Sequence, residues 1–522
     1  MDRRQLLHWV TASTAGLHLP PRAWAQIKLD STPFGLGIAS GSPTHDSVVL
    51  WTRLLQPALQ DPTAPGISVR WEVADDDRFT RIMQSGQSMA VPGLAYSVHA
   101  EVQGLAPDRW YFYRFRVGDA VSPVGRTRTL PAPDALVARM RLAYASCQRW
   151  EHGYFSAYRH MAQENVDLVL FLGDYIYEYP RASNGVRTPP GGWVLTLDDY
   201  RARYATYKQD ADLQAMHAAC PWLVTWDDHE VQNDYAGLSV GENGPDVADF
   251  AARRSAAYQA FYEHMPVRAA VLTRAAAGLA SGAEMRIYKR VQYGQLASLT
   301  LLDARQYKSP QVCTRDGKRG SSTVNPASCA QWNDPARSML GAQQEQWLDA
   351  GWASTQTKST GWNIMGQQSL LGQRDFQAGP GQNFWNDGWD GYSAARGRLI
   401  DSARKNAVPN LVVLGGDVHE NWVGQIKADY ANVASSAVGV EFCGTSITSR
   451  SGGDAKLAET LAENPHFIFA DAQRKGYGVV DITPRQLKTT LRVVSDVTRQ
   501  DASIETLAQF TVASGRAAVE QM

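Results

Sequence analysis

Four short apolar segments of this chain each run into a Cys, Asp or His, and this repetition constrains the fold more than any other feature. The segments are 141–146 before Cys147, 166–172 before Gly173-Asp174, 221–226 before Asp227-Asp228-His229, and 410–414 before Gly415-Gly416-Asp417-Val418-His419. Short continuous apolar runs predict strands that are buried on both faces. Open α/β sheets place their chemistry at the carboxyl ends of such strands. We therefore expect these side chains to meet at one edge of a sheet.

The rest of the chain predicts two folded regions. Residues 34–130 are rich in alternating β-strand patterns, and Leu105-x-Pro107-x-x-x-Tyr111 is similar to the tyrosine corner of fibronectin type III sandwiches. A small fibronectin-III or Ig-like β-sandwich is expected there, followed by a linker at 131–134. From 137 to 500, apolar strands alternate with helical segments, which indicates an α/β domain.

Within the α/β region, the sequence predicts helices over 197–216 and 247–264 and strands of a second sheet at 286–293 and 297–303. The glycine- and tryptophan-rich residues 371–392 are expected to form a loop that could cover an active site. Residues 503–522 are expected to form a loosely attached C-terminal tail.

Composition excludes several classes of protein. The 522 residues are 44% hydrophobic and 20% charged, with a net charge of −1, as in soluble globular proteins. Nothing in the overall charge favours a nucleic-acid-binding module or a membrane surface. Apolar stretches stay well short of the roughly 20 residues that a transmembrane span needs.

The N-terminus predicts export. Arg3 and Arg4 precede a weakly apolar segment, and Ala23-Trp24-Ala25 supplies a small-x-small cleavage pattern. Residues 1–25 therefore read as a twin-arginine signal peptide, which implies the twin-arginine translocation machinery as a partner and a periplasmic or secreted protein. The alternative is a disordered start of a cytosolic protein.

The five cysteines predict different environments. Cys313 and Cys329 flank a polar loop, as a surface disulfide in an oxidising compartment would. Cys220 and Cys443 lie in apolar or glycine-flanked surroundings and are expected to be buried thiols. Cys147 belongs to the set of residues at the strand ends.

These strand-end residues suit a pair of metal ions. Two ions held about 3.5–4 Å apart need a bridging carboxylate, and Asp174 is the candidate. Tyr177 and Cys147 would add a phenolate and a thiolate suited to Fe(III). Asp228 and His229 could supply a ligand and a general acid, and the last two candidates, Asp417 and His419, follow the fourth strand.

The order Cys147, Gly173-Asp174-x-x-Tyr177, Asp228-His229-Glu230, Gly416-Asp417-x-His419 is similar to the calcineurin-like metallophosphoesterase superfamily. With 197–201, 302–307, 34–41 and 50–53 added, the chain resembles the PhoD-like alkaline phosphatase D family. The resemblance implies a four-layer αββα sandwich and a site holding Fe(III) and Ca²⁺. Zn²⁺ or Mn²⁺ is the alternative pair of metals.

The resemblance also implies an activity. It predicts an alkaline phosphatase that hydrolyses phosphate monoesters, and also diesters, through attack by a metal-bound hydroxide. By position, Cys147, Asp174, Tyr177 and His419 would bind iron, with Asp417 close by, and Asp174 and Asp228 would reach toward calcium. A further histidine motif of the superfamily is not evident, and Gln367 or Gln368 stands near its place.

Two roles and two rival functions stay open. His229 is predicted as the general acid and Arg305 as the catalytic, substrate-binding guanidinium that grips the phosphate. The alternatives are a packed histidine and a structural salt bridge. One rival function is a phosphodiesterase or phospholipase acting on lipid or polymer phosphodiesters. The other is an exported binding protein without catalytic activity.

Overall fold

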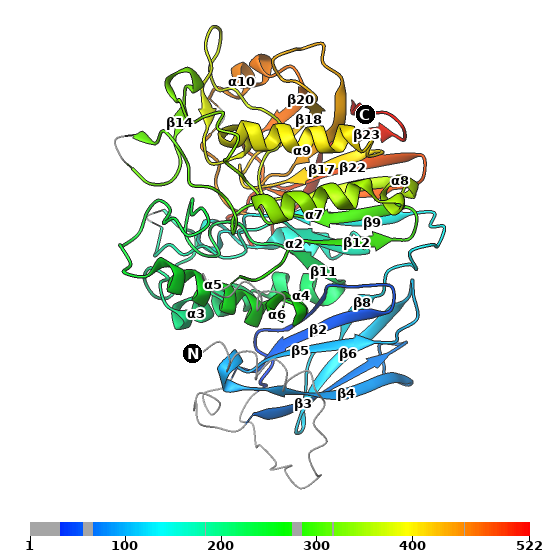
Figure 1. The fold of residues 1–522 in the computed structure, drawn as a ribbon. Coiled ribbons are helices and arrows are strands. Elements are labelled where there is room, and N and C mark those ends of the chain that lie inside the picture. The colour runs from blue at the N-terminus through cyan, green and yellow to red at the C-terminus, as the bar shows by residue number, and fades with distance from the viewer. Residues whose placement is uncertain (1–31, 56–65, 183, 274–283, 316–317, 454) are drawn as a thin grey trace.

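The computed structural model describes residues 32–55, 66–182, 184–273, 284–315, 318–453 and 455–522 (Figure 1). The N-terminal strands lie at the bottom of that view, and the α/β region lies above them. The predicted signal peptide, residues 1–25, falls outside the described residues. None of the described helices is long and apolar enough to cross a membrane.

The larger sheet has ten strands in the order β24-β23-β22-β21-β9-β10-β11-β1-β2-β5. At its centre, β9 and β11 pair in parallel with the two sides of β10. The strands are β1 (Ile38–Gly41), β2 (Ser47–Arg53), β5 (Ser97–Gln103), β9 (Met140–Ala145), β10 (Leu168–Phe171), β11 (Trp222–Val224), β21 (Gly476–Ile482), β22 (Gln486–Val494), β23 (Ile504–Ala513) and β24 (Glu520–Gln521).

The second sheet has seven strands in the order β12-β13-β15-β17-β19-β18-β20. Its parallel core is β13, β15, β17 and β19. The strands are β12 (Lys289–Tyr293), β13 (Ala297–Leu301), β15 (Trp362–Gly366), β17 (Leu411–Gly415), β18 (Asn421–Lys427), β19 (Ala437–Cys443) and β20 (Phe467–Asp471). The predicted strands at 286–293 and 297–303 are thus confirmed as β12 and β13.

The two sheets pack face to face through a shared apolar core, in which Leu170 of β10 and Leu414 of β17 are fully buried. A second core covers the outer face of the ten-stranded sheet with α2 (Ser156–Met161), α3 (Leu197–Lys208), α4 (Ala211–Ala219) and α5 (Phe250–His264). A third covers the outer face of the seven-stranded sheet with α7 (Gly341–Ala353) and α9 (Ser393–Lys405). The expected four-layer αββα architecture is confirmed.

The predicted helix over 197–216 is two helices. Thr196 and Asp199 form a capping box at the start of α3, and the Asp210 carboxylate accepts from the backbone N–H groups of Asp212 and Leu213 to start α4. Asp210 therefore begins a new helix instead of continuing the first. The shorter helices are α6 (Ala270–Thr273), α8 (Thr355–Ser359) and α10 (Leu457–Glu463).

The N-terminal region is β-rich, as expected, but one of its sheets is shared. A five-stranded sheet packs against β1, β2 and β5, which themselves extend the ten-stranded sheet. Its strands are β3 (Ile67–Ala74), β4 (Ile82–Ala90), β6 (Trp110–Val117), β7 (Ala120–Val121) and β8 (Gly125–Arg128). The Tyr111 hydroxyl accepts from the N–H of Ala106 (2.9 Å), which confirms the predicted tyrosine corner.

The predicted loose C-terminal tail is wrong. β23 pairs along its length with β22, and the side chains of Phe510 and Val512 are buried in the core between the two sheets. The alternation of Ala508, Phe510 and Val512 with polar neighbours is the period-2 signal of a half-buried strand, and it accounts for the difference.

Candidate metal centre

The site lies at the carboxyl ends of β9, β10, β11 and β17, in turns with unusual backbone. Cys147, Asp174, Asp417 and His419 all have φ between 57° and 66°, a left-handed conformation that costs roughly 1–3 kcal/mol for a residue other than glycine. Backbone hydrogen bonds connect these turns to one another. The N–H of Cys147 donates to the carbonyl of Gly173 (3.0 Å).

Two glycines allow these turns to approach closely. A Cβ on Gly173 would lie 2.5 Å from the Cβ of Asp227, and a Cβ on Gly416 would lie 2.3 Å from the Oγ of Ser146. Both distances are shorter than real side chains tolerate. Glycine at these positions therefore brings the turn after β10 against that after β11, and the turn after β17 against that after β9.

Glu230 fixes the arrangement with its carboxylate. It accepts from the backbone N–H groups of Asp174 (3.1 Å), Tyr175 (2.6 Å) and Asp227 (2.9 Å). A fully buried carboxylate thus joins the turns after β10 and β11. Burial raises the pKa of Glu230 to about 7 even though these hydrogen bonds favour its charged form.

The first group of potential metal ligands consists of Cys147, Asp174 and His419, whose ligand atoms lie within 4.8 Å of one another. The Tyr177 hydroxyl lies among them, donating to Oδ2 of Asp174 (2.8 Å) and 3.2 Å from Nε2 of His419. Nδ1 of His419 donates to the carbonyl of Arg450 (2.8 Å), which leaves Nε2 as the lone-pair nitrogen that faces the group.

The second group shares Asp174 with the first and adds Asp228 and His229. Nδ1 of His229 donates to Oε2 of Glu178 (2.7 Å), so the ring orientation is fixed. Although burial lowers the pKa of His229, the charges of Glu178 and Asp174 raise it well above the ordinary value. The second group therefore contains a histidine whose charged form is favoured by the carboxylates around it.

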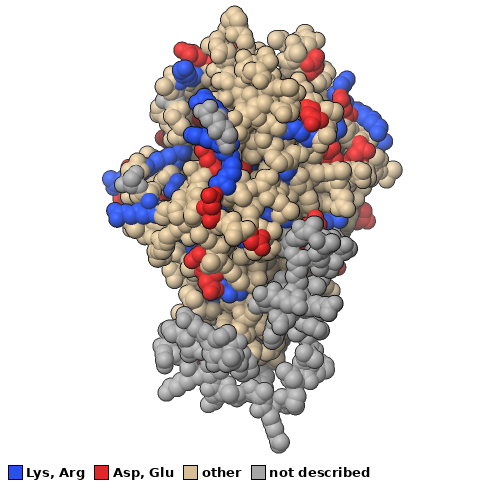
Figure 2. Space-filling model, turned by 60° about the vertical axis from the view of Figure 1, so that its left-hand side comes forward, with Lys and Arg blue, Asp and Glu red and all other residues tan. Residues whose placement is uncertain are grey.

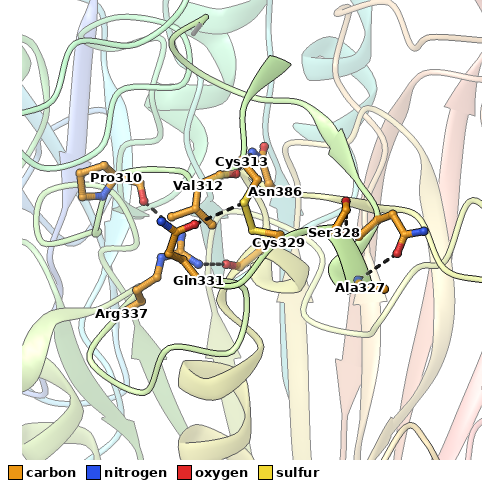
Figure 3. Close-up of a disulfide and its surroundings, with 11 residues drawn as sticks. Pro310, Val312, Cys313, Ala327, Ser328, Cys329, Gln331, Arg337 and Asn386 are labelled. Atoms are coloured by element: carbon orange, nitrogen blue, oxygen red, sulfur yellow. Dashed lines mark hydrogen bonds between the residues drawn. A yellow bond between two sulfur atoms is a disulfide. The ribbon is translucent and has the colours of Figure 1, made fainter. Parts of the chain in front are cut away.

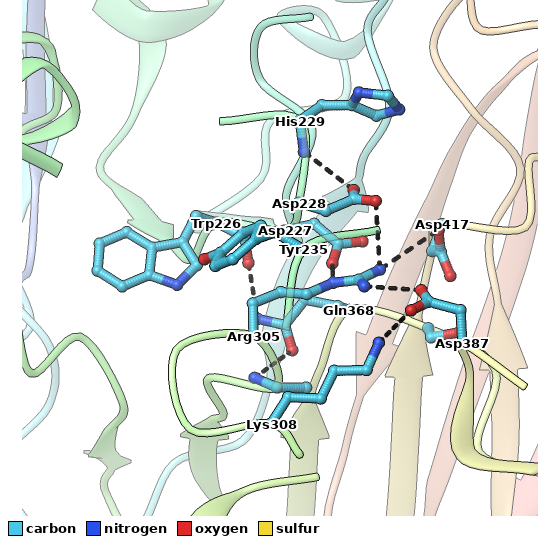
Figure 4. A network of polar contacts seen from close by, with 12 residues as sticks. Trp226, Asp227, Asp228, His229, Tyr235, Arg305, Lys308, Gln368, Asp387 and Asp417 are labelled. Carbon is cyan, nitrogen blue, oxygen red and sulfur yellow. Dashed lines mark hydrogen bonds and ion pairs between the residues drawn. The ribbon is translucent and has the colours of Figure 1, made fainter. Parts of the chain in front are cut away.

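The third group, Asp228, Asp234 and Asp387, lies beside basic side chains of the protein itself. Lys308 forms a buried ion pair with Asp387, and Arg305 contacts Asp387 (2.6 Å) and Asp228 (3.7 Å) (Figure 4). These ammonium and guanidinium groups neutralise the carboxylates in place.

The donor set of the first two groups fits a cation. Burial and the charge of Asp228 raise the pKa of Asp174 well above its ordinary value, and burial does the same for the Cys147 thiol and the Tyr177 phenol. Oδ1 of Asp174 is buried and has no hydrogen-bond partner among the described residues. Burial therefore disfavours the charged forms of these groups, and a metal ion between them would stabilise those charged forms.

The strand-end residues predicted from the sequence lie in the ligand groups, except Asp417, which lies beside Arg305, and Arg305 itself lies among carboxylates. Its guanidinium binds Asp227 and Asp387 and lies 4.0 Å from Asp417 (Figure 4). The side chain is 3% exposed. The role of Arg305 as the phosphate grip stays a prediction. Its Nε and Nη1 donate to carboxylates, as in a structural salt bridge, whereas Nη2 lies 3.7 Å from Asp228 and 4.0 Å from Asp417.

The two glutamines near the missing histidine motif have structural contacts. Nε2 of Gln368 donates to the carbonyls of Trp226 (2.8 Å) and Leu302 (3.0 Å). Oε1 of Gln367 accepts from the indole of Trp389 (2.9 Å). Among the described residues, neither belongs to a ligand group. Asp417 also lies outside the three groups, beside Arg305.

The loop at 371–392 contributes to the site through Asp387. It contains β16 (Phe384–Trp385), which pairs with β14 (Thr323–Val324). Asn386 donates to the carbonyl of Val312 (2.8 Å), close to the disulfide that joins Cys313 and Cys329 (Figure 3). The predicted disulfide and the two predicted buried thiols, Cys220 and Cys443, are confirmed.

Sequence reasoning missed three residues of the site: Glu178, which binds His229, Glu230, which joins two turns, and Asp387. Glu178 and Glu230 belong to the sequence motifs, but their hydrogen-bond partners include backbone and ring groups that belong to other segments of the chain. A carboxylate directly after a predicted ligand was the available signal. For Asp387 the sequence offered none, because the strand before it, β16, has only two residues and leaves no apolar pattern.

Comparisons with known proteins agree with this geometry. Residues 142–491 match the family described as "PhoD-like phosphatase", and residues 21–131 match "PhoD-like phosphatase, N-terminal domain". Alkaline phosphatase D of Bacillus subtilis (strain 168) is 45% identical over 490 residues, covering 92% of this chain and 81% of the relative. A solved structure titled "Structure of PhoD" superimposes with a TM-score of 0.86 at 43% identity, covering 95% of this chain and 93% of the other.

Proposed function

Because this chain belongs to the PhoD-like phosphatase family and is a phosphoric ester hydrolase, we propose that it is an exported, metal-dependent enzyme that hydrolyses phosphate monoesters at alkaline pH, and also diesters. The observation that carries the metal dependence is Asp174, a buried carboxylate common to two ligand groups. Sharing one carboxylate is how two closely spaced ions are held in phosphoester hydrolases.

The proposed ligands divide between two ions. Cys147, Asp174, Tyr177 and His419 would hold Fe(III), because thiolate and phenolate donors suit a strongly acidic ion. Asp174 and Asp228 would hold Ca²⁺, which takes carboxylate oxygens. When bound, such ions supply Lewis-acid stabilisation of the negative charge on the phosphoryl oxygens.

The chain's own residues would handle the leaving group. Glu178 binds Nδ1 of His229, so a proton on Nε2 is available to the departing oxygen of the ester. The ring of His229 lies 4.0 Å from the ring of Tyr177, tilted by 32°, so this donor is beside the first ligand group. Arg305 would act by neutralising Asp227, Asp228 and Asp387, which keeps the ligand carboxylates in position.

The first test is metal analysis of the purified enzyme together with its activity. Iron and calcium in the protein, a visible charge-transfer band from Tyr177 or Cys147, and alkaline hydrolysis of p-nitrophenyl phosphate would support the proposal. Zinc or manganese with the same activity would overturn the proposed metals alone. Protein without metal and without turnover would favour the exported binding protein.

A second comparison separates the two hydrolase functions. Turnover of p-nitrophenyl phosphate is measured against that of its bis-p-nitrophenyl diester. A higher kcat/KM for the monoester supports the proposal, and a clear preference for the diester supports the phosphodiesterase or phospholipase.

Export is tested at the signal peptide. We expect replacement of Arg3 and Arg4 by Lys to leave the active enzyme in the cytoplasm, because the paired arginines are what the translocation machinery reads. Equal amounts of wild type and variant outside the cytoplasmic membrane would contradict the twin-arginine assignment.

A further inference from the structure

Arg149 stands out because its guanidinium has no hydrogen-bond acceptor among the described residues. Nε is buried and unpartnered, and the nearest carboxylate, Oε1 of Glu151, is 3.8 Å from it. The side chain is nevertheless only 17% exposed. By contrast, carboxylates take up the guanidinium of Arg305. A desolvated guanidinium with free donors is unfavourable unless a ligand completes it.

The position of Arg149 is set by the two tyrosines of the site. Its guanidinium carbon lies 5.6 Å from the ring centre of Tyr177 and 4.6 Å from that of Tyr179. The same two rings contact His229, at 4.0 Å and 5.2 Å. Stacking on aromatic rings holds a guanidinium plane in place while its edge stays available to an anion. Arg149 and the proposed proton donor therefore border the same space.

Arg149 lies outside the ligand groups. The guanidinium acts on His152, where burial and then Arg149 and Arg450 lower the pKa to about 3. Arg149 thus lies outside the three ligand groups and close to His152.

Arg450 adds a second cation beside His152. Its backbone N–H donates to Nδ1 of His152 (3.2 Å) and its carbonyl accepts from His419 (2.8 Å), so the residue is tied to the first ligand group. Its side chain is exposed and contacts the carbonyl of Asn184 through Nη2 (2.8 Å). We call Arg149 and Arg450 the basic rim. Figure 2 turns forward the side with the loops around β14 and shows Lys and Arg gathered over part of it.

We propose that the basic rim binds a second negative charge of the substrate, carried on the leaving group beside the scissile phosphoester. The inference rests on the proposed function and names its substrate class: phosphoesters whose leaving group bears its own phosphate or carboxylate. The metal centre and His229 act on the scissile phosphoester, whereas the rim contacts the charged group on the leaving group. Charge-assisted bonds to a guanidinium supply both affinity and geometric selection.

The test uses two esters that differ in one charge, 3-carboxyphenyl phosphate and its methyl ester, with phosphate release as the readout. We expect wild type to show the lower KM for the charged ester and to lose that preference as ionic strength rises. Arg149→Met should raise KM for the charged ester about tenfold and leave KM for the methyl ester nearly unchanged. Arg149→Lys should retain part of the preference.

A matched control is Arg126→Met, because Arg126 also stacks on an aromatic ring, Trp110, at 4.0 Å, but in the N-terminal region. It should change neither KM. Arg450→Gln tests the second cation of the rim separately from Arg149. It should raise KM for the charged ester alone.

Two results would overturn the proposal, and a third would contradict the function on which it rests. Equal loss of kcat/KM for both esters in Arg149→Met would mean that Arg149 acts on the phosphoryl group or on structure. A wild type that hydrolyses both esters with the same KM would remove the rim as a binding site. A wild type that hydrolyses neither would instead contradict the proposed function itself.

Discussion

His229 shows how a single residue acquires its role from a partner far along the chain. The sequence identified it by its place after a strand, next to Asp228. The hydrogen bond from Nδ1 to Glu178, 51 positions away, is what orients the ring. Sequence patterns could predict which side chains reach the sheet edge, because strand ends are local features. They could not predict the partners of Glu178, Glu230 or Arg305, because those partners come from other turns.

Replacing His229 by Gln should lower kcat about 10²- to 10⁴-fold for an alkyl ester such as glycerol phosphate, with a smaller loss for p-nitrophenyl phosphate. A poor leaving group needs the proton more than a good one. Steady-state kinetics on both substrates and metal analysis check this. Glu178→Gln is the companion variant and should show the same pattern more weakly. A large loss of bound metal in His229→Gln would make His229 a ligand instead of an acid.

Arg305→Met should destabilise the fold more than it affects substrate binding. Breaking a buried ion pair from one side leaves uncompensated carboxylates at a cost of about 3–5 kcal/mol, here at Asp227 and Asp387. Denaturant unfolding of the variant and of wild type measures the difference. An unchanged unfolding midpoint combined with a raised KM would support the phosphate-gripping role that the sequence suggested.

At the scale of secondary-structure elements, long strands and helices could be predicted from the sequence, whereas a helix break and two short strands could not. The sequence predicted β12, β13 and α5 to within a few residues, because alternation and helical composition are local signals. It missed the break at Asp210 and the short strands β14 and β16. Two-residue strands have no periodicity to detect, and they exist here because the disulfide loop and the 371–392 loop lie side by side.

The disulfide should matter for the site through this pair of loops. In the Cys313→Ser/Cys329→Ser double variant, the chain between the cysteines gains freedom in the unfolded state, which should reduce stability by about 3 kcal/mol. The contact from Asn386 to Val312, and with it the position of Asp387, should loosen. Thermal unfolding and kcat of the oxidised wild type, the reduced wild type and the variant would measure this. Identical kcat in all three would separate the disulfide from the site.

At the scale of the whole molecule, the ten-stranded sheet joins regions that the sequence treated as separate. The predicted sandwich and the predicted tail both contribute strands to it, β1, β2 and β5 on one side and β23 and β24 on the other. The α/β class could be predicted, because buried strands alternate with helical segments along the chain, whereas the four-layer arrangement was implied by the family resemblance. The edges of the sheet could not, because strand pairing over such distances leaves no local pattern.

Deleting residues 504–522 should therefore unfold or precipitate the α/β region. The deletion removes β23 and the buried side chains of Phe510 and Val512, each worth about 1.5–3 kcal/mol when buried. A matched deletion of residues 514–522 keeps β23 and should remain soluble and active. Solubility, circular dichroism and activity distinguish the two. A folded, active protein lacking 504–522 would support the loosely attached tail.

The neighbours of β9 also determine when the chain can fold. β10 follows β9 closely, but the other neighbour, β21, begins at residue 476, and the register joins Tyr144 to Gly478. After the first four hundred residues have been synthesised, β9 can therefore pair with β10 but not yet with β21. Contacts between such distant segments slow folding. The pairing of β9 with β21 must wait until residues 476–482 have been synthesised, so this strand edge needs protection from association with other chains until then.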